Sequence, residues 1–317
     1  MDESLIETNV VQNPPKKHHY IPQFYLKRWA LTDNKLAVYD RPNPRTRAAQ
    51  AKMKHPAETG WKEGAYQFEG LPEDKRNRLE SAFFSMLDGK AADARELMET
   101  PGSTWTVELR YAWVMFLMSL ISRHPDDIEA FKSVYIRDFN KVSQAEQEAY
   151  EKARQMGDPA TAEEFFANVG PEFLRNMAIN NIPKLIMHEN AVKSLMNMHW
   201  SVATPPPDGY FFTSDRPTIR TFLGRENSHW LVPIGPQKLF VAAERKEYGE
   251  RIHKAIWKQG WKEVNRQVVR QAVQFGYAVT EDHLPFFDKH LSKETRPSMY
   301  LSFVPDPKTA PPLKKPP

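Results

Sequence analysis

An eleven-residue run of apolar side chains near the middle of the chain constrains the fold more than any other segment. Residues 111–121 read YAWVMFLMSLI, between Arg110 and Arg123. In a helix over 103–122 these side chains cover every face, and such a helix has to be buried on all sides. The rest of the chain must therefore pack around it. Crossing a bilayer takes about 20 apolar residues, so we expect no membrane partner.

The absence of cysteine from all 317 residues removes several kinds of chemistry at once. Disulfides, iron–sulfur clusters, cysteine-ligated zinc and cysteine nucleophiles are excluded, so a metal ion would need His, Asp or Glu ligands. Hydrophobic residues make up 40% of the chain and charged residues 26%, which is typical of globular proteins. The acidic N-terminus lacks the apolar segment of a secretory signal, and we expect a cytoplasmic protein.

Hydrophobic patterning divides the chain into a helical middle, residues 73–198, and a β-rich part, residues 199–280. A short helix should begin at Pro22. Helical spacing predicts longer helices at 73–99, 103–122, 125–140, 171–196 (with a kink at Pro183) and 261–275. Strands are expected at 36–39, at 65–68 and in the runs WSVAT, GYFFTS, HWLVPI and KLFVAA.

These elements predict an α+β fold, namely a helix-rich single domain with a small antiparallel sheet built mainly from the C-terminal third. Strand 36–39 could join that sheet. We place the domain at residues 16–304. The polar arm 1–15 and the Pro- and Lys-rich tail 305–317 are expected to be disordered.

The net charge of +4 is concentrated at the N-terminal end. Residues 1–60 hold ten Lys and Arg against six Asp and Glu, and the remaining residues hold 34 of each. Between residues 16 and 54 the ratio is ten to two. Such a local positive field attracts polyanions. We interpret residues 16–54 as a candidate nucleic-acid surface, with an ordinary solvated basic face as the alternative.

The segment KKHHYIPQFYLKRW, which starts at Lys16, carries the first candidate site residues. Lys16, Lys17 and Tyr20 are candidates for substrate binding. His18 and His19 are candidates for a general base or a metal ligand, because a neutral imidazole can accept a proton or bind a metal. Adjacent side chains diverge, so we expect one histidine to be functional and the other structural. The alternative is that both pack beneath a buried aromatic stripe.

The segment FFTSDRP carries the second set of candidates. Ser214 and Asp215 end a β-rich run just before Pro217, at a strand end where sites commonly lie. Asp215 is a candidate catalytic residue or metal ligand, and Ser214 is a candidate for substrate binding. The alternative is an Asx turn, in which the Asp side chain bonds nearby backbone. We expect the two segments to converge in space.

Both segments resemble the hallmarks of one family. HHYIPQFYLKRWA is similar to the HHYVPQFYL opening of the domain-of-unknown-function 4238 family, and FFTSDRP is similar to its strand ending in TSD-x-P. WLVPIGPQKLF resembles its PLSP strand pair, and VNRQVVRQAVQFGYA resembles its last helix, over residues 16–280 in all. Arg216 stands where the family often has Asn, and Ile234-Gly235 where it has Leu-Ser. The resemblance implies one microbial, mostly intracellular domain without an established activity.

The leading functional hypothesis is a nuclease-like hydrolase that cleaves phosphodiesters in nucleic acid. His18 or His19 would be the general base or a metal ligand, with Asp215 as its partner. The substrate would be held and oriented by Lys16, Lys17, Tyr20, Arg123, Ser214 and Asn265. A divalent metal ion could take part, with His19 and Asp215 as candidate ligands. The chain contains neither a P-loop nor a G-x-G-x-x-G motif, so we predict no nucleotide cofactor.

The alternative hypothesis belongs to a different functional class. In it, the chain is a non-catalytic module that binds nucleic acid through phosphates and base stacking or senses a small ligand, or it is a toxin-like effector. The HH and SDRP segments would then be contacts that close the fold. The two hypotheses differ in geometry, because a catalytic His and Asp need an open cleft, whereas structural ones are buried and bonded to backbone.

Overall fold

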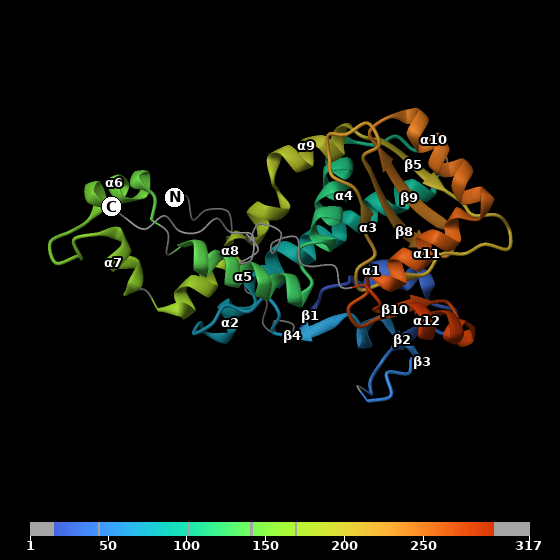
Figure 1. Cartoon of the computed structure of the whole chain (residues 1–317), viewed down its shortest axis with the longest axis horizontal. Coiled ribbons are helices and arrows are strands. Elements are labelled where there is room, and N and C mark those ends of the chain that lie inside the picture. Colours follow the sequence, from blue (N-terminus) through green and yellow to red (C-terminus); the bar gives the residue numbers. More distant parts are fainter. Residues whose placement is uncertain (1–15, 44, 101, 140–141, 169, 295–317) are drawn as a thin grey trace, which may run out of the picture.

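The computed structural model describes residues 16–294 except 44, 101, 140, 141 and 169 (Figure 1). The predicted disordered arm 1–15 and tail 305–317 lie outside the described residues. The helices are α1 Gln23–Leu26, α2 Glu73–Arg76, α3 Ser85–Glu99, α4 Val107–Leu120, α5 Pro125–Phe139, α6 Gln144–Ala153, α7 Ala162–Ala167, α8 Pro171–Ile186, α9 Glu189–Asn197, α10 Lys246–Ala255, α11 Trp261–Arg270 and α12 Leu284–His290. The strands are β1 Lys17–His19, β2 Leu36–Asp40, β3 Gln50–Lys54, β4 Trp61–Glu63, β5 His199–Ala203, β6 Thr213–Ser214, β7 Ile219–Arg220, β8 His229–Gly235, β9 Lys238–Ala243 and β10 Gly276–Ala278.

Helix α4 is the buried centre that the apolar run predicts. Every residue from Ala112 to Leu120 is buried. The helix begins at Val107 rather than at residue 103, because the Thr106 side chain accepts a hydrogen bond from the Leu109 amide at 3.1 Å and so caps it. Trp113 packs edge-on against Phe240 of β9, which joins the helix to a sheet. No helix in the described part of the chain has the length and apolar character to cross a membrane.

Two four-stranded antiparallel sheets confirm the α+β class. One sheet has the order β5-β9-β8-β7, and three of its four strands come from the C-terminal third. The other has the order β3-β2-β10-β6, so it takes two of its four strands from the N-terminal part. Strand β2, predicted at 36–39, pairs with β10 over 200 positions away, with Val38 opposite Tyr277. A third, two-stranded sheet pairs β1 with β4.

The first sheet is covered by helices on both faces (Figure 1). Side chains alternate along β5, so Trp200 and Val202 share the face that belongs to the core around α4. Ser201 points to the opposite face, where its hydroxyl lies 2.8 Å from Nε2 of His253 on α10. Helices α10 and α11 therefore cover the second face.

Several local predictions are wrong. Residues 65–68 form no strand, and β3 and β4 lie nearby instead. Strand β3 is at a sheet edge and only half-buried, so its sequence QAKMK lacks apolar alternation. The helix predicted over 171–196 is two helices, because it ends after Ile186 and His188 is extended (φ −55, ψ 112). Helices α6 and α7 were not predicted, since they bury few apolar side chains.

Candidate functional site

Strand β1 places the two adjacent histidines in different environments. Lys17 is exposed, His18 is fully buried and His19 is half-buried. This pattern follows from the period of two along a strand. The Lys17 ammonium group lies 4.4 Å from the ring centroid of Trp61, on the paired strand β4. Lys16 is also exposed, and its carbonyl accepts a hydrogen bond from the amide of Gly64.

Both ring nitrogens of His18 have partners within the fold. Nδ1 accepts a hydrogen bond from the Tyr66 amide at 3.0 Å. Nε2 must then carry the proton, which it donates to Oδ1 of Asn77 at 2.9 Å. The imidazole also stacks on the ring of Tyr66, with centroids 5.3 Å apart. His18 therefore joins β1 to the segments around residues 66 and 77, as a structural histidine does.

His19 is kept neutral at physiological pH. Burial lowers the pKa of its imidazole to about 4, and the positive charges of Arg123 and Lys17 act in the same direction. A hydrogen bond with the backbone of Ala57 opposes this shift but is the smaller effect. The amide of Gln23 lies 3.4 Å from Nε2 of His19, a long contact that another group could replace. A neutral imidazole can accept a proton.

The pKa of Glu80 is shifted in the opposite direction to that of His19. Glu80 lies in the π-helical turn Leu79–Phe84 that leads into α3, and its side chain is 9% exposed. Burial raises the pKa of this carboxyl to about 8, and the like charge of Asp88 acts in the same direction. The positive charge of Arg123 and a hydrogen bond from the His19 amide lower the pKa, but they offset only part of the rise. Its Oε2 atom is buried and has no hydrogen-bond partner among the described residues. At neutral pH Glu80 is therefore a protonated acid.

Arg123 is the charged group that connects these residues. Its side chain is fully buried at the C-terminal end of α4, where Nε donates to the carbonyl of Tyr20 at 3.1 Å and Nη1 donates to Oδ1 of Asp88 at 3.0 Å. Nη2 is buried without a hydrogen-bond partner in the described part of the chain. Burial raises the pKa of Asp88, and the guanidinium opposes that rise. We call His19, Glu80, Asp88 and Arg123 the Arg123 cluster.

A cavity of about 390 Å³ lies at the loop that leads into α2. It is lined by residues 67–71 and Arg76. Arg76 precedes Glu80 by four positions, and the helix is interrupted between them at Asn77 (φ −101, ψ 13). The buried Nε atom of Arg76 has no hydrogen-bond partner among the described residues. The cavity therefore has one cation in its lining, on the helix that precedes the π-helical turn of Glu80.

The two sequence motifs meet, but through their aromatic residues. The Tyr25 hydroxyl donates to the carbonyl of Pro233 at 2.6 Å and lies 2.7 Å from Oγ1 of Thr213. Nε1 of Trp29 donates to the carbonyl of Phe211 at 2.9 Å. The helical end of the first motif is therefore hydrogen-bonded directly to the start of the second motif, at Phe211 and Thr213.

Asp215 is fully buried, and both oxygens of its carboxylate accept hydrogen bonds from backbone amides. It accepts hydrogen bonds from the amides of Val273 at 2.8 Å, Gln274 at 2.6 Å and Phe275 at 2.8 Å. Burial raises its pKa to about 6, although these bonds favour the charged form. The carboxylate therefore closes the turn between α11 and β10.

Ser214 and Asn265 also make contacts that hold the fold. Ser214 Oγ donates to the carbonyl of Val268 at 2.8 Å. The Asn265 amide spans two backbone groups, since Oδ1 accepts from the Phe212 amide and Nδ2 donates to the Tyr210 carbonyl, both at 2.8 Å. Both residues therefore fasten α11 to the second motif.

An ion pair joins the second motif, FFTSDRP, to α5. Arg216 forms an ion pair with the buried carboxylate of Asp127 at 2.9 Å. The rings of Tyr20 and His124 meet edge to face, with centroids 4.9 Å apart. Burial lowers the pKa of His124 to about 3. No group of three or more His, Asp or Glu side chains gathers as a metal site within the described residues.

Sequence reasoning selected His19, Tyr20 and Arg123 but missed Glu80 and Asp88. Both carboxylates lie in a predicted helix, where an acidic residue ordinarily faces solvent. No motif distinguishes them from the other acidic residues of that segment. Only the irregularity of the helix at residues 79–84 marks the position, since π-helical turns are frequent at functional sites.

Comparison with known proteins adds one finding. The model of a protein family described as "Protein of unknown function (DUF4238)" matches residues 17–282. No curated protein matches the chain, and no solved structure matches it.

Proposed function

Because this chain belongs to the DUF4238 family, whose function is unknown, we propose an activity from the geometry of the site, namely phosphodiester hydrolysis with nucleic acid as the substrate class. One observation carries the proposal. The Glu80 carboxyl accepts a hydrogen bond from the His19 amide next to the buried Arg123, and burial lowers the pKa of the imidazole while it raises that of the carboxyl. Titratable groups that are pushed apart in this way are the usual acid and base of an active site.

The protonation states fit a general acid–base reaction at neutral pH. Neutral His19 takes a proton from a water molecule, whose oxygen forms a bond to phosphorus. The bond from phosphorus to the leaving oxygen breaks, and Glu80 gives its proton to that oxygen. The products are a phosphomonoester and an alcohol, and solvent then removes the proton from His19 and returns one to Glu80. The charge of Arg123 stabilises the extra negative charge on the phosphoryl oxygens.

The surrounding charges support a polyanionic substrate. Lys16 and Lys17 are exposed at the start of β1, next to His19. Arg76 lines the cavity at residues 67–71. Phosphates of a nucleic acid would bind these cations, and the scissile phosphate would lie at His19, the half-buried end of the Arg123 cluster. His19, Lys16, Lys17 and Arg123 keep the roles that the sequence hypothesis gave them, whereas Asp215 is replaced as the partner of His19 by Glu80, which acts as the acid.

The test is hydrolysis of bis(p-nitrophenyl) phosphate and of single- and double-stranded DNA and RNA, with and without Mg²⁺, Mn²⁺ or Zn²⁺. His19→Ala and Glu80→Gln should each lower kcat about 100-fold or more. The matched controls are His188→Ala and Glu63→Gln, at exposed positions, which should stay within about twofold. The wild-type rate should fall below about pH 4 and above about pH 8, where His19 gains a proton and Glu80 loses one. Absence of hydrolysis, or equal rates in all variants, would reject the proposal.

A second candidate function rests on a different observation. His18 and Asp215 are bonded to backbone and buried, which is the geometry expected if the two motifs close the fold of a non-catalytic nucleic-acid-binding module. The exposed basic side chains between residues 16 and 54 would then bind phosphates. Strong, salt-dependent binding of nucleic acid without cleavage would favour this candidate.

A further inference from the structure

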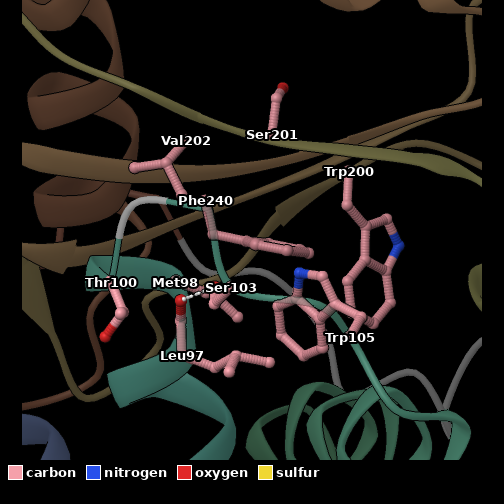
Figure 2. Close-up of a pocket in the computed structure, with 9 residues that line it drawn as sticks. All are labelled: Leu97, Met98, Thr100, Ser103, Trp105, Trp200, Ser201, Val202 and Phe240. Atoms are coloured by element: carbon pink, nitrogen blue, oxygen red, sulfur yellow. Dashed lines mark hydrogen bonds between the residues drawn. The ribbon is translucent and has the colours of Figure 1, made fainter.

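A separate cavity of about 140 Å³ lies between the C-terminal end of α3 and strands β5 and β9 (Figure 2). It has no contact with the Arg123 cluster, and the inference drawn from it is independent of the proposed function. The residues that line it are Leu97, Met98, Thr100, Ser103, Trp105, Trp200, Ser201, Val202 and Phe240. Their side chains are aromatic, aliphatic or hydroxyl-bearing, and that of Ser201 points away from the cavity to His253 (Figure 2).

Aromatic rings in two perpendicular pairs form one wall of this cavity. The rings of Trp105 and Trp200 meet at 89°, with centroids 5.2 Å apart. The rings of Trp200 and Phe240 meet at 81°, with centroids 5.3 Å apart. Figure 2 shows these rings grouped on the side of the cavity formed by the sheet and the segment before α4. A planar guest would therefore meet both ring faces and ring edges, which is the arrangement that aromatic pairs prefer.

The wall is held in place before any ligand binds. Nε1 of Trp200 donates to the Leu195 carbonyl at 3.0 Å. The Arg110 guanidinium lies 3.8 Å from the Trp200 ring centroid, and it also donates to the carbonyls of Met196 and Met198 at 2.9 and 2.6 Å. A preorganised wall loses little entropy on binding.

The lining selects an uncharged ligand. None of the residues that line the cavity carries a charge, so an ion would lose its hydration without a partner. The Trp200 ring already has the Arg110 cation above it, which disfavours a second cation at the same ring. A quaternary ammonium group is therefore a poor candidate, although aromatic rings often bind such groups.

Hydroxyl groups add one polar requirement. Ser103 Oγ donates its proton to the Leu97 carbonyl at 2.6 Å, and Thr100 Oγ1 donates to the Glu96 carbonyl at 3.2 Å. With their protons engaged, these oxygens offer only lone pairs to a guest. The matching group on a ligand is an O–H or N–H donor.

We propose that this cavity binds a small neutral aromatic compound bearing one O–H or N–H group, of which phenol and indole are the simplest examples. The volume supports one such ring, because an apolar cavity of about 150 Å³ in another protein holds benzene. The site is formed by side chains that neither hydrolysis nor nucleic-acid binding requires.

The experiment is ¹⁹F NMR of the full chain labelled with 5-fluorotryptophan, titrated with phenol, indole and benzene. The chain has eight Trp residues, and Trp105→Phe and Trp200→Phe identify the two signals of interest. These two signals should shift saturably with phenol and indole while the other six stay in place. Cyclohexanol, which matches phenol in size and hydroxyl group, and tetramethylammonium should shift them at least tenfold less at equal concentration.

Variants at Ser103 separate the polar contact from the volume. Ser103→Ala should weaken phenol about fivefold and benzene less than twofold, because only phenol uses the oxygen. Ser103→Leu fills the cavity and should abolish both shifts. The matched controls are Ser133→Ala and Ser133→Leu, since the Ser133 hydroxyl donates to the Glu129 carbonyl at an exposed helix position. Circular dichroism verifies that each variant is folded.

Three results would overturn the proposal. The first is that shifts with phenol do not saturate, or move all Trp signals alike. The second is that cyclohexanol or tetramethylammonium binds as strongly as phenol. The third is that a folded Ser103→Leu variant still binds phenol.

Discussion

The hydroxyl group of Tyr25 lies 2.7 Å from Oγ1 of Thr213, and this contact joins the two sequence motifs across 188 positions. Because Tyr25 donates its proton to the Pro233 carbonyl, its oxygen accepts the proton of Thr213. Both residues are fully buried. The convergence of the two motifs is therefore a property of the core, and the chemically capable His19 is left at its border.

Tyr25→Phe should destabilise the protein by about 1–3 kcal/mol, because it leaves a buried hydroxyl and a buried carbonyl without a partner. The measurement is urea unfolding followed by tryptophan fluorescence. Tyr111→Phe is the matched control, since Tyr111 is exposed, and it should change the free energy of unfolding by less than about 0.5 kcal/mol. Equal effects of the two substitutions would contradict the structural role of Tyr25.

The two adjacent histidines should respond differently to replacement. His18→Ala breaks two buried hydrogen bonds and should lower the free energy of unfolding by about 2–4 kcal/mol. His19→Ala should cost about 1 kcal/mol, because the half-buried imidazole has one hydrogen bond, with the Ala57 backbone, and its contact with Gln23 is long. If phosphodiesters are hydrolysed, His19→Ala should abolish turnover in a folded protein. Equal loss of stability in both variants would contradict this division of roles.

Asp215→Asn should destabilise the protein by about 2–4 kcal/mol. The amide retains one acceptor oxygen for three backbone donors and presents an N–H₂ group to them. Asp208→Asn is the control, because Asp208 is exposed. Hydrogen exchange should locate the effect at the amides of Val273, Gln274 and Phe275. Unchanged protection of these amides would contradict the turn-closing role.

Glu80 should make stability depend on pH in a defined window. Its folded-state pKa is raised from 4.5 to about 8, so the folded protein binds the proton more tightly than the unfolded chain. Glu80 therefore contributes stability that is complete below about pH 4.5 and is lost as the pH rises toward about 8, with a slope of at most about 1.4 kcal/mol per pH unit.

His19 acts in the opposite direction. Its pKa is lowered from 6.5 to about 4, so its contribution is present above pH 6.5 and is lost as the pH falls. Between about pH 6.5 and 8 the effect of Glu80 is isolated from that of His19. Denaturant unfolding in this window should show that the free energy of unfolding falls less steeply with rising pH for Glu80→Gln than for the wild type. Glu63→Gln, at an exposed position, should follow the wild-type curve.

Nucleic-acid binding should weaken with salt if residues 16–54 contact phosphates. Each neutralised phosphate contributes a slope of roughly −0.7 to −0.9 to log K against log salt. Replacing Lys16, Lys17, Arg45 and Arg47 by Gln should therefore flatten the slope by up to about 3. The control replaces Lys152, Lys254, Arg154 and Arg251, which are also exposed. Identical slopes for the two variants would remove the basic segment from the interface.

Several features followed from the sequence because they depend on neighbouring residues. The apolar run 111–121 fits only a buried helix, and α4 is buried along its length. The divergence of His18 and His19 follows from strand geometry and needs no knowledge of the rest of the fold. The α+β class follows from the change of pattern near Trp200.

Other features were decided by contacts between distant parts of the chain. From the sequence, Asp215 is as consistent with a catalytic carboxylate as with a turn residue. The hydrogen bonds that it accepts from the amides of residues 273–275 decide for the turn. Glu80 has the pattern of a solvent-facing helix residue, and only its burial in the folded chain raises the pKa of its carboxyl, against the opposing charge of Arg123. Glu80 becomes an acid because burial removes its carboxyl from water. That burial is produced by distant parts of the chain, so the residues next to Glu80 in the sequence do not reveal it.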